Sequence, residues 1–374
     1  MRKLPVLTFL IGAMAGITGM SMISYAEESQ SARSFETGTR PETVALAAEE
    51  RFTKRPVRVL TIAMFQAEAE PWLANENLDI KIQVPGLPTP VRCRAARSGG
   101  TAPDLKHCLV VTGMGGANAA ATIMAVGASR YFDLTDTYFL VAGIAGTSPD
   151  RATLGAAAWA DWVVDGDLAH EIDAREMPEG WTYPYIHLGC NEPWCEDGAV
   201  AGTEVFGLNT DLSERAYELS KNVELADSVD AQAYRANYPE GTPARSTPFV
   251  TRCDSFSSST YWHGKLLADW AGWWTQMWTN GLGDYCMTNM EDSSTLAALD
   301  RLADSGLVDW DRIMVLRTAS NFDQPYPGQS AQESLASNSG AFRPSVQNAY
   351  RVGVAVTDHI LKNWKLWRGG VPAP

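Results

Sequence analysis

The chain has 374 residues, 45% of them hydrophobic, which is enough to bury a sizeable core in one large domain or two smaller ones. Its formal net charge of -14 argues against nucleic acid as a partner, because a polyanion would be repelled. A small neutral ligand is compatible with this charge.

The first residues are typical of a secretory signal. Two basic residues precede an apolar run that ends in the small-x-small pattern Ser24-Tyr25-Ala26. An uncleaved membrane anchor is the alternative, because the run is nearly long enough to span a bilayer. We expect a signal peptide at 1–26, a polar linker at 27–55 and an α/β domain at 56–374, in the periplasm or outside the cell. No later segment is apolar enough to predict a stable membrane span once the leader is removed.

Short apolar, β-rich runs alternate with helix-compatible segments along the rest of the chain. The run from Val57 leads into helix-like residues 67–77, and the run from Cys108 leads into a glycine turn and an alanine-rich helix. A third run, from Thr137, ends in a second glycine turn. This alternation predicts a single α/β domain with a mixed, mostly parallel sheet covered by helices on both faces. The two glycine turns lie at 113–116 and 143–146. The remaining predicted segments lie at 248–258, which includes the turn CDSF, and at 283–291, 293–306, 311–324 and 345–364.

Five tryptophans recur at helical spacing within residues 261–278. They form one apolar stripe, which predicts a helix buried in the core or at the interface of a homo-oligomer. Either role is more typical of such a stripe than contact with a membrane or a cofactor.

All six cysteines lie in the exported part of the chain. An even number in an oxidising compartment favours disulfides over metal binding or redox chemistry. Zinc would need paired close spacings and convergent histidines, which the sequence lacks, so we expect no metal. One predicted pair closes a short loop, one faces across a glycine-rich hairpin, and one joins the two remaining cysteines. These pairs are Cys190–Cys195, Cys93–Cys108 and Cys253–Cys286.

Ligands bind at the carboxyl ends of parallel strands in such a sheet, so the candidate residues cluster there. The turn TGMGGA suggests a dinucleotide site, but that site needs an acidic residue at the end of the next strand. The next strand ends instead in Gly143-Ile144-Ala145-Gly146, so we expect no cofactor. The candidates at strand ends are Glu68, the two glycine turns, Phe256, Glu291 and Asn321.

Six segments, in their shared order, resemble the nucleoside phosphorylase and nucleosidase superfamily, and in particular its exported branch, the purine nucleoside permeases. They are AMFQAEAE, VVTGMGGA, VAGIAGTS, CDSF, NME and RTASNFD, between Arg58 and about Trp364. The resemblance implies a three-layer nucleoside phosphorylase-like sandwich that binds a purine nucleoside.

The resemblance also implies roles for individual residues. Glu291 would accept hydrogen bonds from the ribose 2′- and 3′-hydroxyls, because a carboxylate can take two donors at once, and Met290 would pack on the sugar. Phe256 would stack on the purine, and Asn321 would donate to its N7, with Asp323 as a second candidate proton source. Each residue also has an ordinary reading: a helix N-terminal charge for Glu291, a core side chain for Phe256 and a turn residue for Asn321. Further expected pocket residues are Gly113, Gly143, Gly146 and Ser320.

The choice between phosphate and water as nucleophile depends on arginines. The phosphorylases hold phosphate with arginines near these turns, but here the second such position falls in the apolar stretch Leu140-Val141-Ala142, and none follows the first strand. The nucleosidases use a glutamate that holds water, and Glu68 or Glu70 fits this role. The spacing departs from the nucleosidase pattern by one residue, and Ile144 replaces its usual serine. The sequence therefore predicts a purine nucleosidase.

Two alternatives stay open. The chain could bind nucleosides for uptake without turnover, as the name permease implies, or it could be a phosphorylase with an atypical phosphate site. Glu68 separates the first alternative from an enzyme, because binding needs no residue that activates water. A serine hydrolase is disfavoured, since no G-x-S-x-G elbow is present.

Overall fold

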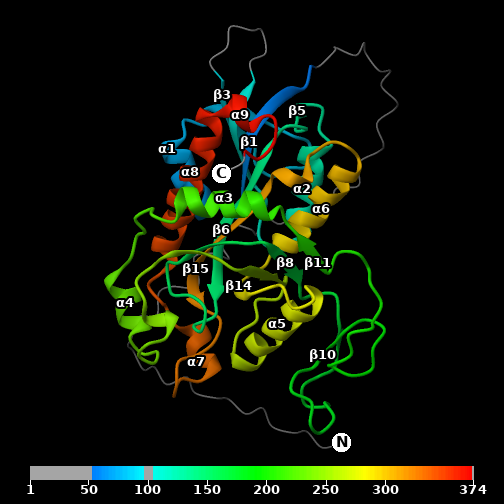
Figure 1. Ribbon diagram of the computed structural model, residues 1–374, viewed down its shortest axis with the longest axis vertical. Coiled ribbons are helices and arrows are strands. Elements are labelled where there is room, and N and C mark those ends of the chain that lie inside the picture. The colour runs from blue at the N-terminus through cyan, green and yellow to red at the C-terminus, as the bar shows by residue number, and fades with distance from the viewer. Residues whose placement is uncertain (1–52, 97–103, 373–374) are drawn as a thin grey trace, which may run out of the picture. The chain divides into compact units, whose positions relative to one another are not determined.

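The computed structural model describes residues 53–96 and 104–372, so the expected signal peptide and almost all of the linker lie outside the described residues. A 13-stranded sheet forms the centre of the fold (Figure 1). Its strands are β1 (Arg55–Ala63), β2 (Ile80–Ile82), β3 (Val91–Ala95), β4 (Leu105–Val111), β5 (Phe132–Asp133), β6 (Tyr138–Thr147), β7 (Ala157–Trp159), β8 (Trp162–Asp165), β11 (Val205–Gly207), β12 (Val250–Arg252), β13 (Asp254–Ser257), β14 (Tyr285–Asn289) and β15 (Ile313–Phe322). A separate hairpin pairs β9 (His170–Glu171) with β10 (Tyr185–Ile186).

The pairing within the sheet is mixed but mostly parallel, which confirms the predicted fold class. The main path runs β11-β8-β13-β14-β6-β1-β4-β3-β2. Strand β1 is parallel to both β4 and β6, and β6 is parallel to β15. Strands β8, β13 and β14 form a second parallel group, which joins β6 through an antiparallel pairing of β14. This junction brings the ends of β14 and β15 to the same part of β6.

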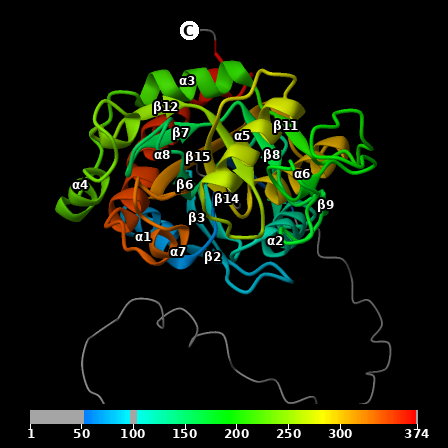
Figure 2. The same cartoon turned by 90° about the horizontal axis from the view of Figure 1, so that it is seen from below.

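Helices follow most of the central strands and lie on both faces of the sheet. They are α1 (Gln66–Asn75), α2 (Gly116–Gly127), α3 (Thr210–Ser220), α4 (Val229–Arg235), α5 (Lys265–Trp278), α6 (Asp292–Asp304), α7 (Ala331–Ala336), α8 (Phe342–Lys362) and α9 (Trp364–Trp367), with short 3-10 turns at Pro243–Arg245 and Trp310–Arg312. Figure 2 shows α1 and α8 on one side of the sheet and α2 and α6 on the other. None of the helices in the described part of the chain is long and apolar enough to cross a membrane.

Alternation along the strands builds two cores. Successive side chains of a strand point to opposite faces, so Ile313 and Val315 of β15 join the core that packs on α2 and α6. Met314 and Leu316 join the core that packs on α1, α3 and α8. The predicted tryptophan helix is α5, and its Trp270 and Trp274 are buried in a third, aromatic cluster. The core role of this helix is therefore confirmed.

Two local predictions are wrong. Residues Gly143–Gly146 do not form a turn but lie inside β6, because β15 pairs with them on one edge and β14 continues the pairing at Gly146. The segment Asp254–Ser257 is likewise strand β13 rather than a turn, held between β8 and β14. In both places pairing with neighbouring strands decides the conformation.

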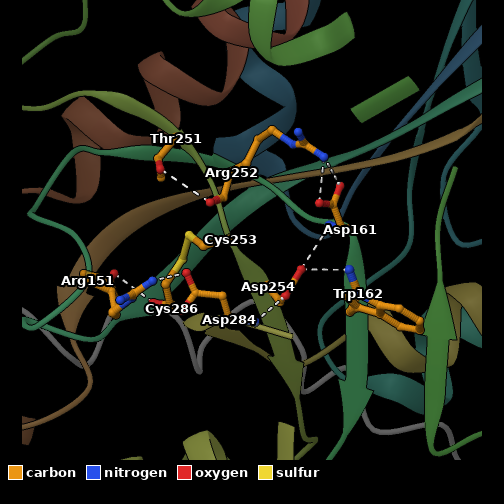
Figure 3. The surroundings of a disulfide bond; sticks show 10 residues. Arg151, Asp161, Trp162, Thr251, Arg252, Cys253, Asp254, Asp284 and Cys286 are labelled. Carbon is orange, nitrogen blue, oxygen red and sulfur yellow. Dashed lines mark hydrogen bonds and ion pairs between the residues drawn. A yellow bond between two sulfur atoms is a disulfide. The ribbon is translucent and has the colours of Figure 1, made fainter. Parts of the chain in front are cut away.

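The three predicted disulfides are all present, namely Cys93–Cys108, Cys190–Cys195 and Cys253–Cys286. Figure 3 shows the surroundings of the third, which ties the start of β13 to β14. Next to it, the Asp254 carboxylate accepts hydrogen bonds from the backbone N–H groups of Asp161, Trp162 and Asp284. The disulfide and these bonds hold β13, β14 and the start of β8 together.

Removing the Cys253–Cys286 disulfide should cost more stability than removing Cys190–Cys195. The two bonds close segments of 33 and 5 residues, and a longer closed loop restricts the unfolded chain more. We expect the double alanine variants to lose about 4 and about 2 kcal/mol respectively in denaturant unfolding. Equal losses for the two pairs would contradict this account of what the long-range disulfide does.

Candidate functional site

The candidate site is built around one buried arginine, Arg317, in the middle of β15. Its side chain is 2% exposed. Nε lies 3.0 Å and Nη2 2.6 Å from Oδ1 of Asp292, and Nη1 donates to the Ile144 carbonyl at 3.0 Å. Burial alone would lower the pKa of Arg317, but Asp292, Glu291 and Glu68 together raise it above its ordinary value. The guanidinium therefore stays charged, and its charge stabilises the nearby carboxylates.

Asp292 is held by polar side chains from the neighbouring strands. Its Oδ2 accepts hydrogen bonds from the Ser255 hydroxyl and the Asn289 amide, both at 2.8 Å. The side-chain oxygen Oδ1 of Asn289 in turn accepts the backbone N–H groups of Glu291 and Asp292 at 3.0 and 2.9 Å. These bonds fix the turn between β14 and α6, and so fix the direction of the Glu291 side chain.

Glu291 joins this turn to the first glycine turn. Its Oε2 lies 3.4 Å from Nη2 of Arg317, and its Oε1 accepts the Gly115 N–H at 2.9 Å. Gly115 precedes α2 and has φ +85°, a conformation that favours glycine. Met290 is half-buried beside Glu291. Gly113, also at positive φ, donates its N–H to the Met64 carbonyl and so ties the turn to the end of β1.

Glu68 of α1 is buried near the same arginine and interacts with it electrostatically. Its Oε2 accepts the Met64 N–H at 2.7 Å and its Oε1 the Ile144 N–H at 2.8 Å. Burial raises the pKa of Glu68 to about 7, although the nearby Arg317 acts to lower it. Glu70 is exposed, so the structure places Glu68 and not Glu70 in the site.

Gly143 makes the meeting of these groups sterically possible. A Cβ at this position would lie 2.6 Å from Oε1 of Glu68, 2.7 Å from Nη1 of Arg317 and 2.9 Å from Sδ of Met64. Any larger residue would push apart the carboxylate and the guanidinium. The glycine expected in a turn is thus needed inside the strand, to let side chains approach from three elements.

The residues expected at the purine lie near the end of β15. The Asn321 amide is half-buried and satisfied locally: its Oδ1 accepts the Ser320 hydroxyl and its Nδ2 donates to the Phe322 carbonyl, both at 3.0 Å. Gly146 faces Asn321 across the strands, and a Cβ on it would lie 3.1 Å from Nδ2. Asp323 is buried, and Oδ2 accepts the Tyr285 hydroxyl at 2.5 Å.

Phe256 lies in the aromatic cluster under α5. Its side chain has no exposed surface, and its ring packs edge-on against Trp270, Trp262 and Tyr285 with centroids 5.0, 5.9 and 6.2 Å apart. In this structure the ring is a core side chain, and its stacking on a purine stays a prediction.

The sequence motifs do not single out Arg317 and Asp292, although both stand inside quoted or adjacent segments. The candidates that the sequence predicts lie at strand ends, whereas Arg317 lies within β15. One signal in the sequence could have pointed to this pair: an arginine stands inside the apolar run IMVLRTAS. A charge buried in a strand needs a partner of opposite charge. Among the described residues, no cluster of His, Cys, Asp and Glu has the arrangement of a metal site.

Comparisons with known proteins agree on a family. The family model described as "Purine nucleoside permease (NUP)" matches residues 56–372. A purine nucleoside permease of Candida albicans is 37% identical over 326 residues, which are 84% of this chain and 77% of that protein. A probable purine nucleoside permease of Schizosaccharomyces pombe is 35% identical over 325 residues, 83% of this chain and 90% of that protein.

One solved structure relates the fold to known enzymes. Futalosine hydrolase of Helicobacter pylori matches with a TM-score of 0.50 at 11% identity, over 82% of this chain and 98% of that one. At this identity the likeness concerns the fold alone, and it confirms the expected nucleoside phosphorylase-like architecture.

The stability of the protein should depend on the titration of Glu68. Its pKa is raised from 4.5 to about 7 on folding, so the stability it contributes is fully present below pH 4.5 and is lost as the pH rises through 7. Between about pH 5 and pH 7 we expect wild type to lose about 1 kcal/mol per pH unit relative to Glu68→Gln, whose amide does not titrate, and above pH 7 the difference should stop growing.

Thermal unfolding at pH 5, 6, 7 and 8 measures this difference. Glu70→Gln is the matched control, because Glu70 is exposed on the same helix and should keep the wild-type slope. If the stability of wild type and of Glu68→Gln changed with pH in the same way, the pKa of Glu68 would not be raised by folding.

Proposed function

The chain belongs to the purine nucleoside permease family, and we propose that it is an exported purine-nucleoside N-ribosyl hydrolase, which cleaves the N-glycosidic bond with water. The observation that carries the proposal is a pair of buried carboxylates: Glu291, which lies 3.4 Å from Arg317, and Glu68, which interacts electrostatically with the same arginine. Two carboxylates in a dry site favour a reaction whose sugar becomes positively charged in the transition state.

Glu291 is the proposed ribose ligand. Each of its two oxygens accepts one hydrogen bond, Oε1 from the Gly115 N–H and Oε2 from Arg317. Each oxygen therefore retains a lone pair for a sugar hydroxyl. A vicinal diol offers two donors at matching spacing. Met290 beside it supplies an adaptable apolar surface for the sugar.

Glu68 is the proposed general base. Each of its oxygens accepts one backbone N–H, which fixes the carboxylate and leaves lone pairs for a water. A pKa of about 7 suits a group that must take a proton at neutral pH. Water oxygen forms the bond to C1′, one water proton passes to Glu68, and the C1′–N9 bond breaks with its electron pair on the purine.

The surroundings of Arg317 favour water over phosphate as nucleophile. A phosphate dianion needs free cationic donors in a dry site. Arg317 is already paired with Asp292, and Glu68 and Glu291 would repel a dianion. The stretch Leu140–Ala142 is buried and apolar, as expected from the sequence.

The purine would leave toward the end of β15, where Asn321, Ser320 and Asp323 lie. Gly146 leaves room for the Asn321 amide beside this strand. Export is proposed from the leader pattern, and three disulfides fit a protein of an oxidising compartment.

A second candidate function is nucleoside binding for uptake without turnover, favoured by the names of the curated relatives. Binding would use Glu291 and the residues near the base, but would not require a Glu68 pKa near neutral pH.

Glu291→Gln should weaken ribonucleoside binding while the fold is kept, because Arg317 retains Asp292 as its partner. A charge-assisted hydrogen bond contributes roughly 1.5 to 3 kcal/mol, so we expect at least a tenfold loss of affinity. Calorimetric titration in a Glu68→Gln background avoids turnover. An unchanged ratio of ribo- to 2′-deoxyribonucleoside affinity would rule out Glu291 as the ribose ligand.

Glu68→Gln should lower the release of base from a purine ribonucleoside by about 10² to 10⁴-fold, while nucleoside affinity changes little. Glu70→Gln is the control and should keep full activity. Release of free base from inosine, adenosine and guanosine is followed by chromatography. Tight nucleoside binding by wild type without any release would overturn the hydrolase proposal and leave the binding protein.

A further inference from the structure

The start of α2 is capped by side chains from other elements. The first N–H groups of a helix have no partner within it, and Gly115, the residue before α2, has no side chain that could accept them. The Gly115 N–H goes to Oε1 of Glu291, and the Gly116 N–H goes to the Ser259 hydroxyl at 3.2 Å. Two residues therefore hold the first glycine turn: the proposed ribose ligand, and a serine that follows β13.

The contact between Ser259 and α2 is close. A Cβ at Gly116 would lie 3.1 Å from Oγ of Ser259 and still closer to Oγ of Ser294 in α6. The missing Cβ lets both serines approach the start of the helix. A shift of Ser259 would therefore be transmitted to the backbone of the glycine turn.

Asp167 holds Ser259 in this place. It lies in the loop after β8, and its two carboxylate oxygens accept hydrogen bonds from one short segment. Oδ1 accepts the Ser258 hydroxyl at 2.6 Å, and Oδ2 accepts the Ser259 N–H at 2.8 Å. The Ser258 oxygen in turn accepts the Thr260 N–H at 3.1 Å. Because a carboxylate can take two donors at once, this one side chain fixes the backbone of residues 258–260.

The loop that carries Asp167 is itself attached to the sheet. Oδ1 of the buried Asp165 accepts the N–H groups of Asp167 and Leu168, both at 2.9 Å. The Gly166 N–H donates to the Ser257 carbonyl at 2.8 Å, which continues the parallel pairing of β8 with β13. Asp167 therefore stands on a hydrogen-bonded support, although it is itself exposed.

We propose that Asp167 is a positioning residue of the nucleoside site, which acts on the sugar through Ser259 and Glu291. It holds the Ser259 hydroxyl against the start of α2, and the turn held in this way gives the Gly115 N–H to Glu291. That N–H is one of the two donors that orient the Glu291 carboxylate, and Arg317 is the other. This inference rests on the proposed role of Glu291 as the ribose ligand.

The expected signature of this role is a change in sugar preference. Without the hydrogen bonds of Asp167, the Glu291 carboxylate loses the orientation in which it can accept both the 2′- and the 3′-hydroxyl. Ribonucleosides should then lose affinity, whereas 2′-deoxyribonucleosides, which offer one donor of the two, should lose less. A merely structural role would weaken the binding of both ligands alike.

The first test compares the binding of adenosine and 2′-deoxyadenosine by calorimetric titration in a Glu68→Gln background, which avoids turnover. We expect Asp167→Ala to reduce the preference for the ribonucleoside about fivefold, the contribution of one hydrogen bond. Asp167→Asn should keep most of the preference, because its amide oxygen can still accept the Ser259 N–H. An unchanged preference in Asp167→Ala would overturn the proposal.

Two further variants make this comparison specific. Ser259→Ala removes one exposed hydroxyl without touching the Asp167 loop, and it should reproduce the loss of preference. Asp173→Ala is the matched control, because it removes an exposed carboxylate a few residues further along the chain that hydrogen-bonds Arg175 instead. A loss of preference in Asp173→Ala equal to that in Asp167→Ala would show an effect of charge alone and contradict the positioning role.

The second test is a double-mutant cycle with Glu291→Gln, again in the Glu68→Gln background. If Asp167 acts through the Glu291 carboxylate, Asp167→Ala should not change the sugar preference that remains in Glu291→Gln. A fivefold effect of Asp167→Ala that persists without this carboxylate would contradict the proposed route. Failure of the proposed function is recognised separately: the site with Asp167 and Glu291 intact would then show no preference for ribonucleosides, and the role of Glu291 would fall together with this inference.

Discussion

The site depends on a single buried positive charge. A guanidinium removed from water is destabilising unless its charge is matched, and Asp292 matches that of Arg317 at 2.6 Å. Once that pair is formed, Glu291 and Glu68 are brought to the rim of the same guanidinium, where they are left with unfilled hydrogen-bonding capacity. The oxygens of Glu291 and Glu68 can therefore still accept hydrogen bonds from a ligand. What remains is a buried place of negative charge, suited to a sugar that becomes cationic.

The topology of the sheet allows four distant segments to meet at this charge. Arg317 comes from β15, Glu68 from the first turn of α1, and Glu291 from the turn after β14, while Gly143 of β6 lies between them. The antiparallel pairing of β14 with β6 carries the chain back along β6 from Gly146, and so brings Glu291 to Arg317. A disulfide joins Cys286 of β14 to Cys253, just before β13. The strand pairings that build the sheet therefore also position the residues of the site.

Much of this arrangement could be predicted from the sequence, because it depends on local patterns. The strand and helix order, the three cysteine pairs and the placement of Glu291 at the end of a strand follow from periodicity, spacing and the order of short motifs. The sequence leaves Glu68 and Glu70 both open, and burial shows that Glu68 faces inward. Arg317 could not be found in this way, because its partner Asp292 is 25 positions away and only the folded sheet brings them together. The same reason explains Gly143: glycine often marks a turn, but here three side chains from other elements require its missing Cβ.

The central claim is that water attacks the sugar at a site whose one buried cation is already neutralised. The rate of base release as a function of phosphate concentration, with identification of the sugar product, tests this most directly. The account predicts release in phosphate-free buffer, free ribose as the product and no increase in rate when phosphate is added. Release that requires phosphate and yields ribose 1-phosphate would contradict it.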